Sequence, residues 1–466
     1  MRPGIDLAGK RMLVVGVART GVAVSLFSAG YGAVVTATDE KPEAELGPAP
    51  ARLREAGVTL ALGAHDSSIF LDQDLIILSP GVPAHLPALD QARARGIAVW
   101  SEIELAWRFL RGKLVAITGS NGKTTTTSLV AHILKTAKIP TLVGGNIGTP
   151  LLALVESSSD STVTVAELSS FQLETTDSFR PEIGVLLNLT PDHLDRHASF
   201  EEYASAKLRI FENQLDRDAA ILNADDPEVA RRAPSKPHVF WFSRLKRVAA
   251  GAFLHDDQII FRNEGSEDVV ARREDIPLRG NHNLENILAA CAAAALAGAS
   301  PAAIASGVKS FQGVEHRLEF VAEIAGVQFY NDSKATNVDA TVKALEAFPG
   351  PLLVILGGKD KGSSYAPLRD LLHQRARMAL LIGAASEKIA AELGDAVSVA
   401  RAGTMARAVE EAMNAAQPGD VVLLAPACSS FDQFENYEHR GRVFKELVAA
   451  LASARQSGEA SLRKGS

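Results

Sequence analysis

The sequence predicts an α/β protein of several domains, in which helices cover mostly parallel sheets. Short β-branched runs alternate with amphipathic stretches along the whole chain, and this pattern favours α/β folds over sandwiches and helix bundles. Three runs end in glycine-rich or polar loops, near residues 16, 120 and 357. At about 150 residues per domain, the 466 residues agree with three domains. We expect these domains to cover residues 1–101, 102–313 and 314–466.

The composition predicts a folded protein of the reducing cytoplasm. The net charge of −7 leaves no excess of cations for a phosphate backbone, so nucleic acid is not an expected partner. The longest uncharged apolar stretch, residues 287–299, is well short of the roughly 20 residues that span a bilayer, so no membrane helix is expected. Cys291 and Cys428 lie outside any CxxC spacing, which agrees with a reducing compartment. No secretion signal is expected before the strand at residues 11–17.

The first glycine-rich loop runs from Gly16 to Gly21 and follows a predicted strand. Asp39 comes after it at close to the spacing of a dinucleotide site. Ala18 replaces the middle glycine, which lets a pyrophosphate approach the backbone. A dinucleotide and another nucleotide therefore stay equally open as ligands. A dehydrogenase would use Gly16 and Asp39 but would leave the second loop without a role.

The second loop, Thr118-Gly-Ser-Asn-Gly-Lys-Thr124, lies between a predicted strand at 114–117 and a helix that begins near Thr124. Glycines let backbone N–H groups surround phosphate oxygens, lysine reaches the terminal phosphates, and a threonine hydroxyl holds Mg2+. Ile117 stands where the strict P-loop pattern has glycine, so this is a shortened variant. The loop predicts ATP binding.

Polar residues follow several other predicted strands. Glu167 follows residues 162–166, where a ligand residue and a solvated carboxylate are both possible interpretations. The strand at 183–189 leads into a cluster with His193, which fits a zinc or manganese ligand, a base or a loop residue. Near the C-terminus, residues 331–337 and 428–434 carry lysine and hydroxyl groups that suit anion binding.

Taken together, these motifs resemble one family, the Mur ligases of peptidoglycan synthesis. The resemblance covers nearly the whole chain and rests on TGSNGKTT, GGNIGTP, ELSSFQLE, TPDHLDRH, YASAK, NHNLEN, EHRLE, NDSKATN, GGKDKG and PACSSFDQF. It implies an N-terminal Rossmann-like domain for a uridine nucleotide, a central P-loop ATPase and a C-terminal Rossmann-like domain that receives an amino acid. The last blocks point to the member that adds D-glutamate.

The resemblance also assigns roles to individual residues. Those that it places at ATP are Gly119, Asn121, Gly122, Lys123, Thr124, Thr125, Asn283, Asn286, Arg317 and Asp332. Those that it places in catalysis are Lys123, His193, Lys207 and Lys334. It implies two Mg2+ ions, whose ligands would be Thr124, Glu167, His193 and Lys207 as a carbamate.

The same resemblance predicts substrate contacts. The UDP-sugar and other substrate contacts in the first two domains would come from Arg19, Thr20, Ser79, Asn146 and Gln172. The glutamate carboxylates would bind Thr336, Lys361, Ser430 and Tyr437. Two positions depart from the family pattern: Glu40 stands where a hydroxyl residue is common, and Tyr437 where phenylalanine is common.

The implied activity is an ATP-dependent ligase that joins D-glutamate to UDP-N-acetylmuramoyl-L-alanine through an acyl phosphate. We expect a cytoplasmic monomer with small-molecule substrates. Another Mur ligase or a folate polyglutamate synthase would share the ATP loop, but the C-terminal blocks argue against both. A non-catalytic nucleotide-binding protein is a further alternative, and intact Lys123, Glu167, His193 and Lys207 argue against it.

Overall fold

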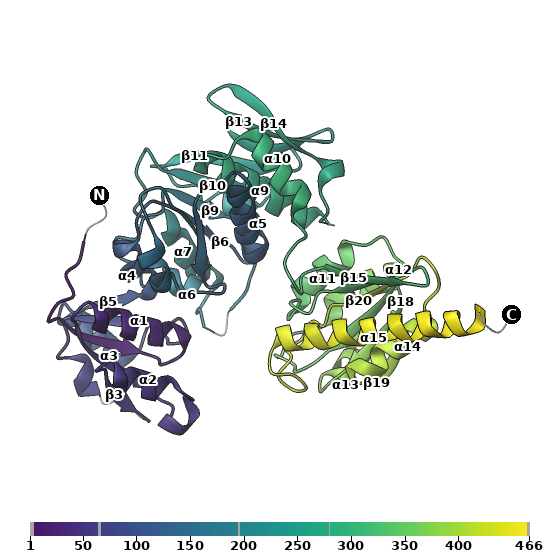
Figure 1. The fold of residues 1–466 in the computed structure, drawn as a ribbon, viewed down its shortest axis with the longest axis horizontal. Coiled ribbons are helices and arrows are strands. Elements are labelled where there is room, and N and C mark those ends of the chain that lie inside the picture. Colours follow the sequence, from purple (N-terminus) through teal and green to yellow (C-terminus); the bar gives the residue numbers. More distant parts are fainter. Residues whose placement is uncertain (1–3, 64–66, 194–195, 279, 464–466) are drawn as a thin grey trace. The chain divides into compact units, whose positions relative to one another are not determined.

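The computed structural model describes residues 4–63, 67–193, 196–278 and 280–463. By its internal contacts the chain divides into two units, Met1–Ile276 with Glu285–Phe311, and Pro277–Leu284 with Gln312–Ser466. Within the described residues the strands form three sheets, two in the first unit and one in the second (Figure 1). Most strand pairs are parallel, which confirms the predicted α/β class. The domain boundaries near 101 and 313 stay a prediction.

The first sheet is parallel and has the order β3-β2-β1-β4-β5. Its strands are β1 (Arg11–Val15), β2 (Val34–Asp39), β3 (Thr59–Leu62), β4 (Leu75–Leu78) and β5 (Ala98–Ser101). The connecting helices are α1 (Arg19–Gly30), η1 (Glu43–Glu45), α2 (Ala49–Glu55), η2 (Ser67–Phe70) and α3 (Pro87–Ala94). Because β1 pairs with both β2 and β4, the strand order reverses there, and ligands usually bind at such a point.

The second sheet has the order β14-β13-β12-β11-β10-β9-β6-β8-β7. Its strands are β6 (Lys113–Thr118), β7 (Thr141–Gly145), β8 (Val163–Glu167), β9 (Ile183–Leu186), β10 (Ala219–Asn223), β11 (His238–Ser243), β12 (Gly251–His255), β13 (Gln258–Asn263) and β14 (Ser266–Arg272). Its helices are α4 (Glu102–Phe109), α5 (Lys123–Thr136), η3 (Leu151–Ser157), α6 (Ser170–Leu173), α7 (Phe200–Leu208), η4 (Arg209–Phe211), α8 (Pro227–Ala230), η5 (Arg273–Asp275), α9 (Asn281–Ala297) and α10 (Pro301–Ser310).

The strand predicted at residues 183–189 is shorter than expected. It ends at Leu186, and the backbone just beyond it bonds to the last residue of β6 and to the loop that follows β6. The Leu187 N–H donates to the Thr118 carbonyl at 3.0 Å, and the Ser120 N–H donates to the Asn188 carbonyl at 3.0 Å. The residues that leave the strand therefore support the ATP loop.

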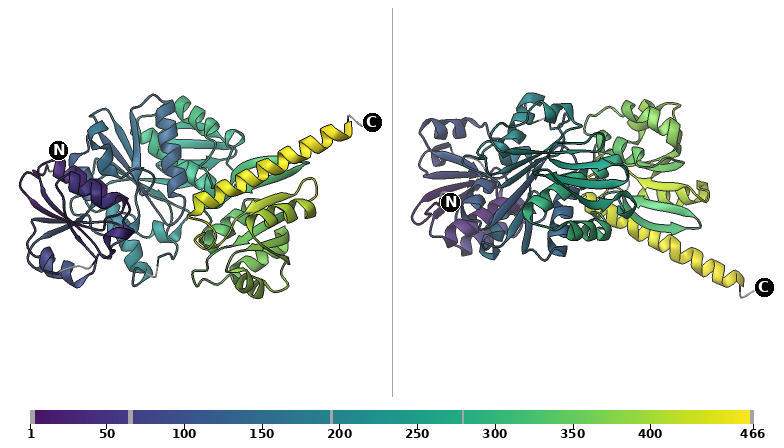
Figure 2. Two further views of the ribbon diagram at one scale, coloured as in Figure 1. Left: turned by 60° about the horizontal axis from the view of Figure 1, so that its bottom comes forward. Right: turned by 90° about the horizontal axis from the view of Figure 1, so that it is seen from above.

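The third sheet forms the second unit and has the order β15-β16-β20-β17-β18-β19. Its strands are β15 (Glu319–Ile324), β16 (Val327–Asn331), β17 (Leu352–Gly357), β18 (Ala376–Ile382), β19 (Ser398–Gly403) and β20 (Val421–Leu424). Its helices are α11 (Val338–Glu346), η6 (Ala366–Leu368), α12 (Arg369–Arg375), α13 (Ser386–Leu393), α14 (Met405–Ala415) and α15 (Tyr437–Arg463). Figure 2 shows that α15 is the long helix that runs along this unit and continues past its sheet.

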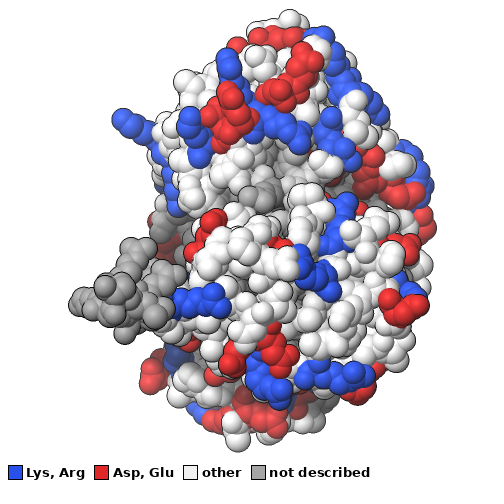
Figure 3. Space-filling model, turned by 90° about the vertical axis from the view of Figure 1, so that its right-hand side faces the viewer, with Lys and Arg blue, Asp and Glu red and all other residues white. Residues whose placement is uncertain are grey.

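The surface carries both signs of charge. On the face in Figure 3, basic and acidic side chains are interspersed rather than gathered by sign. Among the described residues, none of the helices has the length and hydropathy needed to cross a membrane.

Candidate active site

The ATP loop connects β6 to α5 at the carboxyl end of the second sheet. Gly122 has a φ of +85°, and a Cβ there would lie 2.1 Å from Asn286 Oδ1. A Cβ on Gly119 would lie 2.9 Å from the Leu187 Cβ. Both positions therefore exclude larger residues, and the loop leads into the N-terminus of α5, a place where a helix favours a phosphate.

Side chains from the segment after β9 and from α7 hold this loop in shape. Asn188 Oδ1 accepts from the Asn121 N–H at 2.8 Å, and its Nδ2 donates to the Asn121 carbonyl at 3.1 Å. The Ser120 hydroxyl donates to the Thr190 carbonyl at 3.0 Å and accepts from the Tyr203 hydroxyl at 2.9 Å. The loop is thus preorganised by the segment that follows β9 and by α7, which are remote from it in sequence.

Lys123, at the first position of α5, folds back over the loop. Its ammonium donates to the carbonyls of Gly119 at 2.7 Å and Ser120 at 2.8 Å. The next residues, Thr124 and Thr125, are buried at the start of the helix. The amine and the helix N-terminus therefore face the same loop, as the sequence predicts for a phosphate site.

Glu167 ends β8, next to β6 in the sheet, and is 3% exposed. Its Oε1 accepts from Asn146 Nδ2 at 3.0 Å. Its Oε2 is buried and has no hydrogen-bond partner among the described residues. An unpaired buried carboxylate oxygen is costly unless something compensates it, and a divalent cation does so. This oxygen fits the predicted magnesium site.

Lys207 on α7 is 1% exposed, and its amine donates to the Gly119 carbonyl at 3.0 Å. The amine also lies 4.7 Å from the centre of the Tyr203 ring. Burial, and secondarily the charge of Lys123, lower the pKa of Lys207 well below its usual value. A neutral amine is a nucleophile and an ammonium is not, so Lys207 can react with an electrophile such as CO2.

His193 is less well integrated into the site. Its side chain is 49% exposed, its φ is +53°, and its ring packs edge-on against Phe171 at 5.0 Å. Residues 194 and 195 of the same motif lie outside the described residues. In the described part of the chain, the clusters of three potential ligands are His85, Glu174 and Glu202, and Glu315, His316 and Glu319. Ligation by His193 stays a prediction.

The loops of the first sheet use their polar side chains internally. The Asp39 carboxylate accepts from the N–H groups of Val17 at 2.7 Å and Lys41 at 3.0 Å. The Ser79 hydroxyl donates to the Gly16 carbonyl at 2.9 Å. These bonds shape the loop after β1, and they argue against Asp39 as a ribose ligand in a dehydrogenase.

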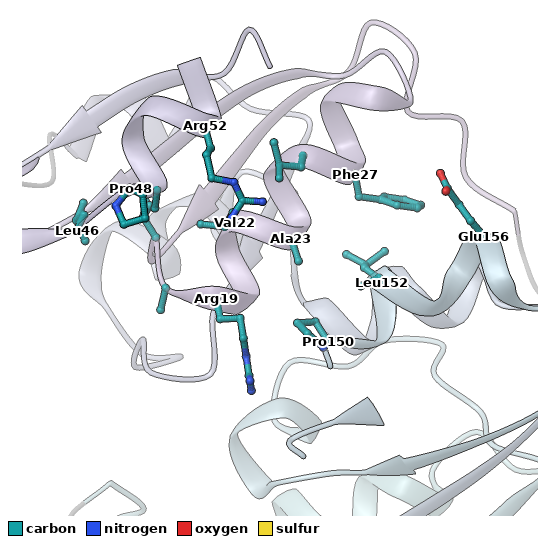
Figure 4. Close-up of a pocket in the computed structure, with 15 residues that line it drawn as sticks. Arg19, Val22, Ala23, Phe27, Leu46, Pro48, Arg52, Pro150, Leu152 and Glu156 are labelled. Carbon is teal, nitrogen blue, oxygen red and sulfur yellow. The ribbon is translucent and has the colours of Figure 1, made fainter. Parts of the chain in front are cut away.

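A cavity of about 650 Å3 lies beside this loop, between α1, α2 and η3 (Figure 4). Its walls are mostly apolar, and Arg19 and Arg52 contribute guanidinium groups. Of the residues expected at the UDP-sugar, only Arg19 lines this cavity within the described chain. Thr20 lies on α1. Gln172 is buried in the helix cap of α6, where its Oε1 accepts from the Ser169 N–H at 3.0 Å.

In the second unit, the predicted motifs follow β16, β20 and β17, which are neighbours in the sheet. The loops bond to one another: the Ala427 N–H donates to the Ala335 carbonyl at 2.9 Å, and the Lys359 N–H donates to the Ser429 carbonyl at 2.9 Å. Motifs that lie far apart in the sequence therefore meet at one sheet edge, as parallel strands require.

Asp332 and Arg317 lie at this edge. Asp332 is buried, accepts from the Leu318 N–H at 3.3 Å, and has its pKa raised to about 6 by burial, with Arg317 opposing the shift. Arg317 Nε is buried without a hydrogen-bond partner in the described chain. Buried polar groups of this kind are typical of a site that pairs with a ligand.

The other residues predicted to contact ATP or glutamate lie in the second unit and on α9. Lys334 Nζ lies 5.5 Å from the centre of the Tyr437 ring. Ser430 is buried, Thr336 is half-buried and Lys361 is exposed. Asn283 and Asn286 are both buried on α9, Asn283 in the second unit and Asn286 in the first.

Sequence reasoning assigned no role to two residues that support the site. Tyr203 precedes Lys207 by one helical turn, and this spacing is a signal that could have identified it. Arg440 is buried on α15, donates to Ser333 and Cys428, and forms no ion pair among the described residues. Its sequence context carries no such signal, because its partners come from other loops.

Comparisons with known proteins agree with this arrangement. Family models match the chain over residues 10–101 (Mur ligase MurD-like, N-terminal domain), 117–294 (Mur ligase middle domain) and 316–428 (Mur ligase, glutamate ligase domain). The chain is 53% identical to a UDP-N-acetylmuramoylalanine--D-glutamate ligase of Koribacter versatilis, over 96% of this chain and 99% of the relative. It is 54% identical to the ligase of the same name from Acidobacterium capsulatum, over 97% and 98%.

Solved structures with the same fold include a pseudomurein peptide ligase from Methanothermus fervidus, with a TM-score of 0.60 and 20% identity over 95% of this chain and 100% of that one. MurF ligase from Thermotoga maritima has a TM-score of 0.59 and 18% identity over 96% of both chains. These identities support the fold alone. The relatives at more than half identity over nearly the full length, together with the three domain models, show that this chain belongs to the Mur ligase family.

Proposed function

We propose that this chain is an ATP-dependent ligase that adds D-glutamate to UDP-N-acetylmuramoyl-L-alanine. The observation that carries the proposal is the environment of Lys207. This buried amine bonds to the ATP loop at Gly119 and has a strongly lowered pKa. The choice of substrates is supported by relatives whose names state this reaction.

Lys207 would act as a carbamate. Its neutral amine attacks CO2, a C–N bond forms, and one proton leaves to solvent. The product is an anionic oxygen ligand in place of a potential cation. Together with Glu167 Oε2 and the Thr124 hydroxyl, it would supply oxygen ligands for two Mg2+ ions, with His193 as a further ligand. When bound, Mg2+ neutralises the negative charge of the phosphates.

The reaction would proceed in two steps. The terminal carboxylate of the UDP-sugar substrate attacks the γ-phosphorus of ATP, and ADP leaves. The amine of D-glutamate then attacks the resulting acyl phosphate, an amide bond forms, and phosphate and a proton leave. Lys123 and the N–H groups of the loop would hold the transferred phosphoryl group, because phosphoryl transfer depends mainly on positioning and charge neutralisation.

The other substrate contacts follow the predicted assignments. Arg19, Thr20, Ser79 and Asn146 would bind the UDP-sugar, with Ser79 and Asn146 also shaping their loops through Gly16 and Glu167. Lys334, Arg317 and Asp332 would contact the nucleotide. Thr336, Lys361, Ser430 and Tyr437 would bind the glutamate carboxylates. We propose a monomer that acts in the cytoplasm.

The experiment is an assay of phosphate release with ATP, Mg2+, UDP-N-acetylmuramoyl-L-alanine and one amino acid at a time. D-glutamate should support turnover, and Lys123→Ala should abolish it in a folded protein. Lys135→Ala is the matched control, because Lys135 is an exposed lysine near the end of the same helix. Turnover with another amino acid but not D-glutamate would show a different ligase, and wild-type rates in Lys123→Ala would contradict the role of the loop.

A further inference from the structure

Two loops of the second unit carry residues proposed to bind glutamate. One follows β17 and carries Lys361, and the other follows β20 and carries Ser430. The strands are neighbours, and the loops pair directly. Besides the backbone bond from Lys359, the Ser429 hydroxyl donates to the Lys359 carbonyl at 3.1 Å. The position of Lys361 therefore depends on how these loops are held together.

Tyr365 connects the two loops through its side chain. The residue is 1% exposed, and its hydroxyl donates to Asp360 Oδ1 at 2.8 Å and lies 3.0 Å from Cys428 Sγ. Burial raises the pKa of both Tyr365 and Cys428, so both groups keep their protons at neutral pH. With the phenol proton directed at the carboxylate, the thiol of Cys428 donates to the phenol oxygen.

Asp360 immediately precedes Lys361. A free Asp360 carboxylate would compete with the substrate carboxylate for the positive charge of Lys361. Its second oxygen, Oδ2, accepts from Lys388 Nζ of α13 at 2.9 Å. Hydrogen bonds from Lys388 and Tyr365 lower the pKa of Asp360, so the carboxylate is charged. Both of its oxygens are engaged, and its charge is compensated by Lys388 rather than by Lys361.

We propose that Tyr365, Asp360 and Lys388 form a positioning cluster that sets the affinity for a dicarboxylic amino acid. The cluster ties the two loops together and keeps Lys361 available for a substrate carboxylate. An Asp360 without Lys388 would pair with Lys361 or repel the incoming anion, because nearby unit charges interact strongly where water is partly excluded. This inference rests on the proposed function, since it needs D-glutamate as the amino acid.

The test measures the KM for D-glutamate and for ATP in the full chain. Tyr365→Phe removes the hydroxyl that links the two loops and should raise the KM for D-glutamate about tenfold, on the order of the effect of one hydrogen bond to a charged group. Lys388→Met should raise it about tenfold as well, since it uncovers the charge of Asp360. Adding Asp360→Asn to Lys388→Met should bring the KM back to that of Asp360→Asn alone. The KM for ATP should not change.

Arg401→Gln is the matched control. Arg401 lies on β19 and pairs at 2.8 Å with Glu387, the neighbour of Lys388 on α13. Arg401 has no bond to either loop in the described structure, so its loss should leave both KM values unchanged. An unchanged KM for D-glutamate in Tyr365→Phe and Lys388→Met, beside an active wild type, would overturn this inference and leave the proposed function standing. Failure of Asp360→Asn to rescue Lys388→Met would overturn the charge argument. A wild type without turnover on D-glutamate would overturn both proposals.

Discussion

Lys207 shows how burial changes the chemistry of one residue. Its lowered pKa makes the amine reactive toward CO2, and the proposed carbamate supplies oxygen near Glu167. We expect Lys207→Ala to be inactive and to be rescued in part by acetate, because a small carboxylate can replace the carbamate. Lys207→Arg is the control, since arginine is also a long side chain but cannot form the carbamate. The measurement is phosphate release with and without acetate; an active Lys207→Ala enzyme in CO2-depleted buffer would contradict the role.

Glu102 couples stability to pH. It is fully buried on α4, where its Oε1 accepts from the Leu152 N–H at 2.7 Å, and burial raises its pKa to about 7. The folded state binds this proton more tightly than the unfolded state. Its contribution to stability is therefore complete below the ordinary pKa of 4.5 and is lost as pH rises through about 7, a change of about 3 kcal/mol.

Glu102→Gln removes this titration. We expect the variant to have a higher Tm than the wild type at pH 8 and nearly the same Tm at pH 5, because only the wild type must bury a charge at the higher pH. Thermal unfolding followed by circular dichroism at both values checks this. A difference in Tm between the two proteins that does not vary with pH would show that Glu102 stays charged throughout.

At the scale of elements, the start of α5 depends on glycine at position 122. Gly122→Ala should raise the KM for ATP at least about tenfold, because a Cβ would meet Asn286 Oδ1 at 2.1 Å and the left-handed φ adds about 1 kcal/mol of strain. Gly96→Ala is the control: Gly96 has a φ of +78° and open space around its Cβ. Steady-state kinetics on both variants separate the effect of the Asn286 contact from that of the backbone strain, which both variants share. Equal KM values in the two variants would show that the approach of α9 does not matter.

At the scale of the whole molecule, the ATP loop and the glutamate residues belong to different units. Lys361→Ala should therefore impair the use of D-glutamate while ATP binding stays unchanged.

The wild type should reject D-alanine, because this amino acid has no side-chain carboxylate to pair with the donors proposed for glutamate. L-glutamate should fail because its amine would be misplaced, which costs about a hundredfold in rate. We also expect no use of meso-diaminopimelate. Initial rates with each amino acid measure this; comparable rates on L-glutamate would refute the assignment.

Much of the ATP site could be predicted because its signal is local. The strand, glycine loop, Lys123 and helix follow one another within a short segment, and the structure has them in that arrangement. Asp39 shows the opposite case. Its spacing from Gly16 is typical of a dinucleotide site, yet its carboxylate bonds to the N–H groups of Val17 and Lys41. Spacing alone does not say which partner a carboxylate takes.

By itself, the sequence determined the α/β class, the order of the motifs and the residue types at the ends of the strands, because strand and turn preferences act between near neighbours. Tertiary structure decided which of these groups are charged, paired or exposed. The unpaired oxygen of Glu167, the low pKa of Lys207 and the link from Tyr365 to Cys428 all depend on burial and on partners from other elements. Such properties arise only when the sheets bring remote segments together, since desolvation and short-range bonds have no counterpart in an extended chain.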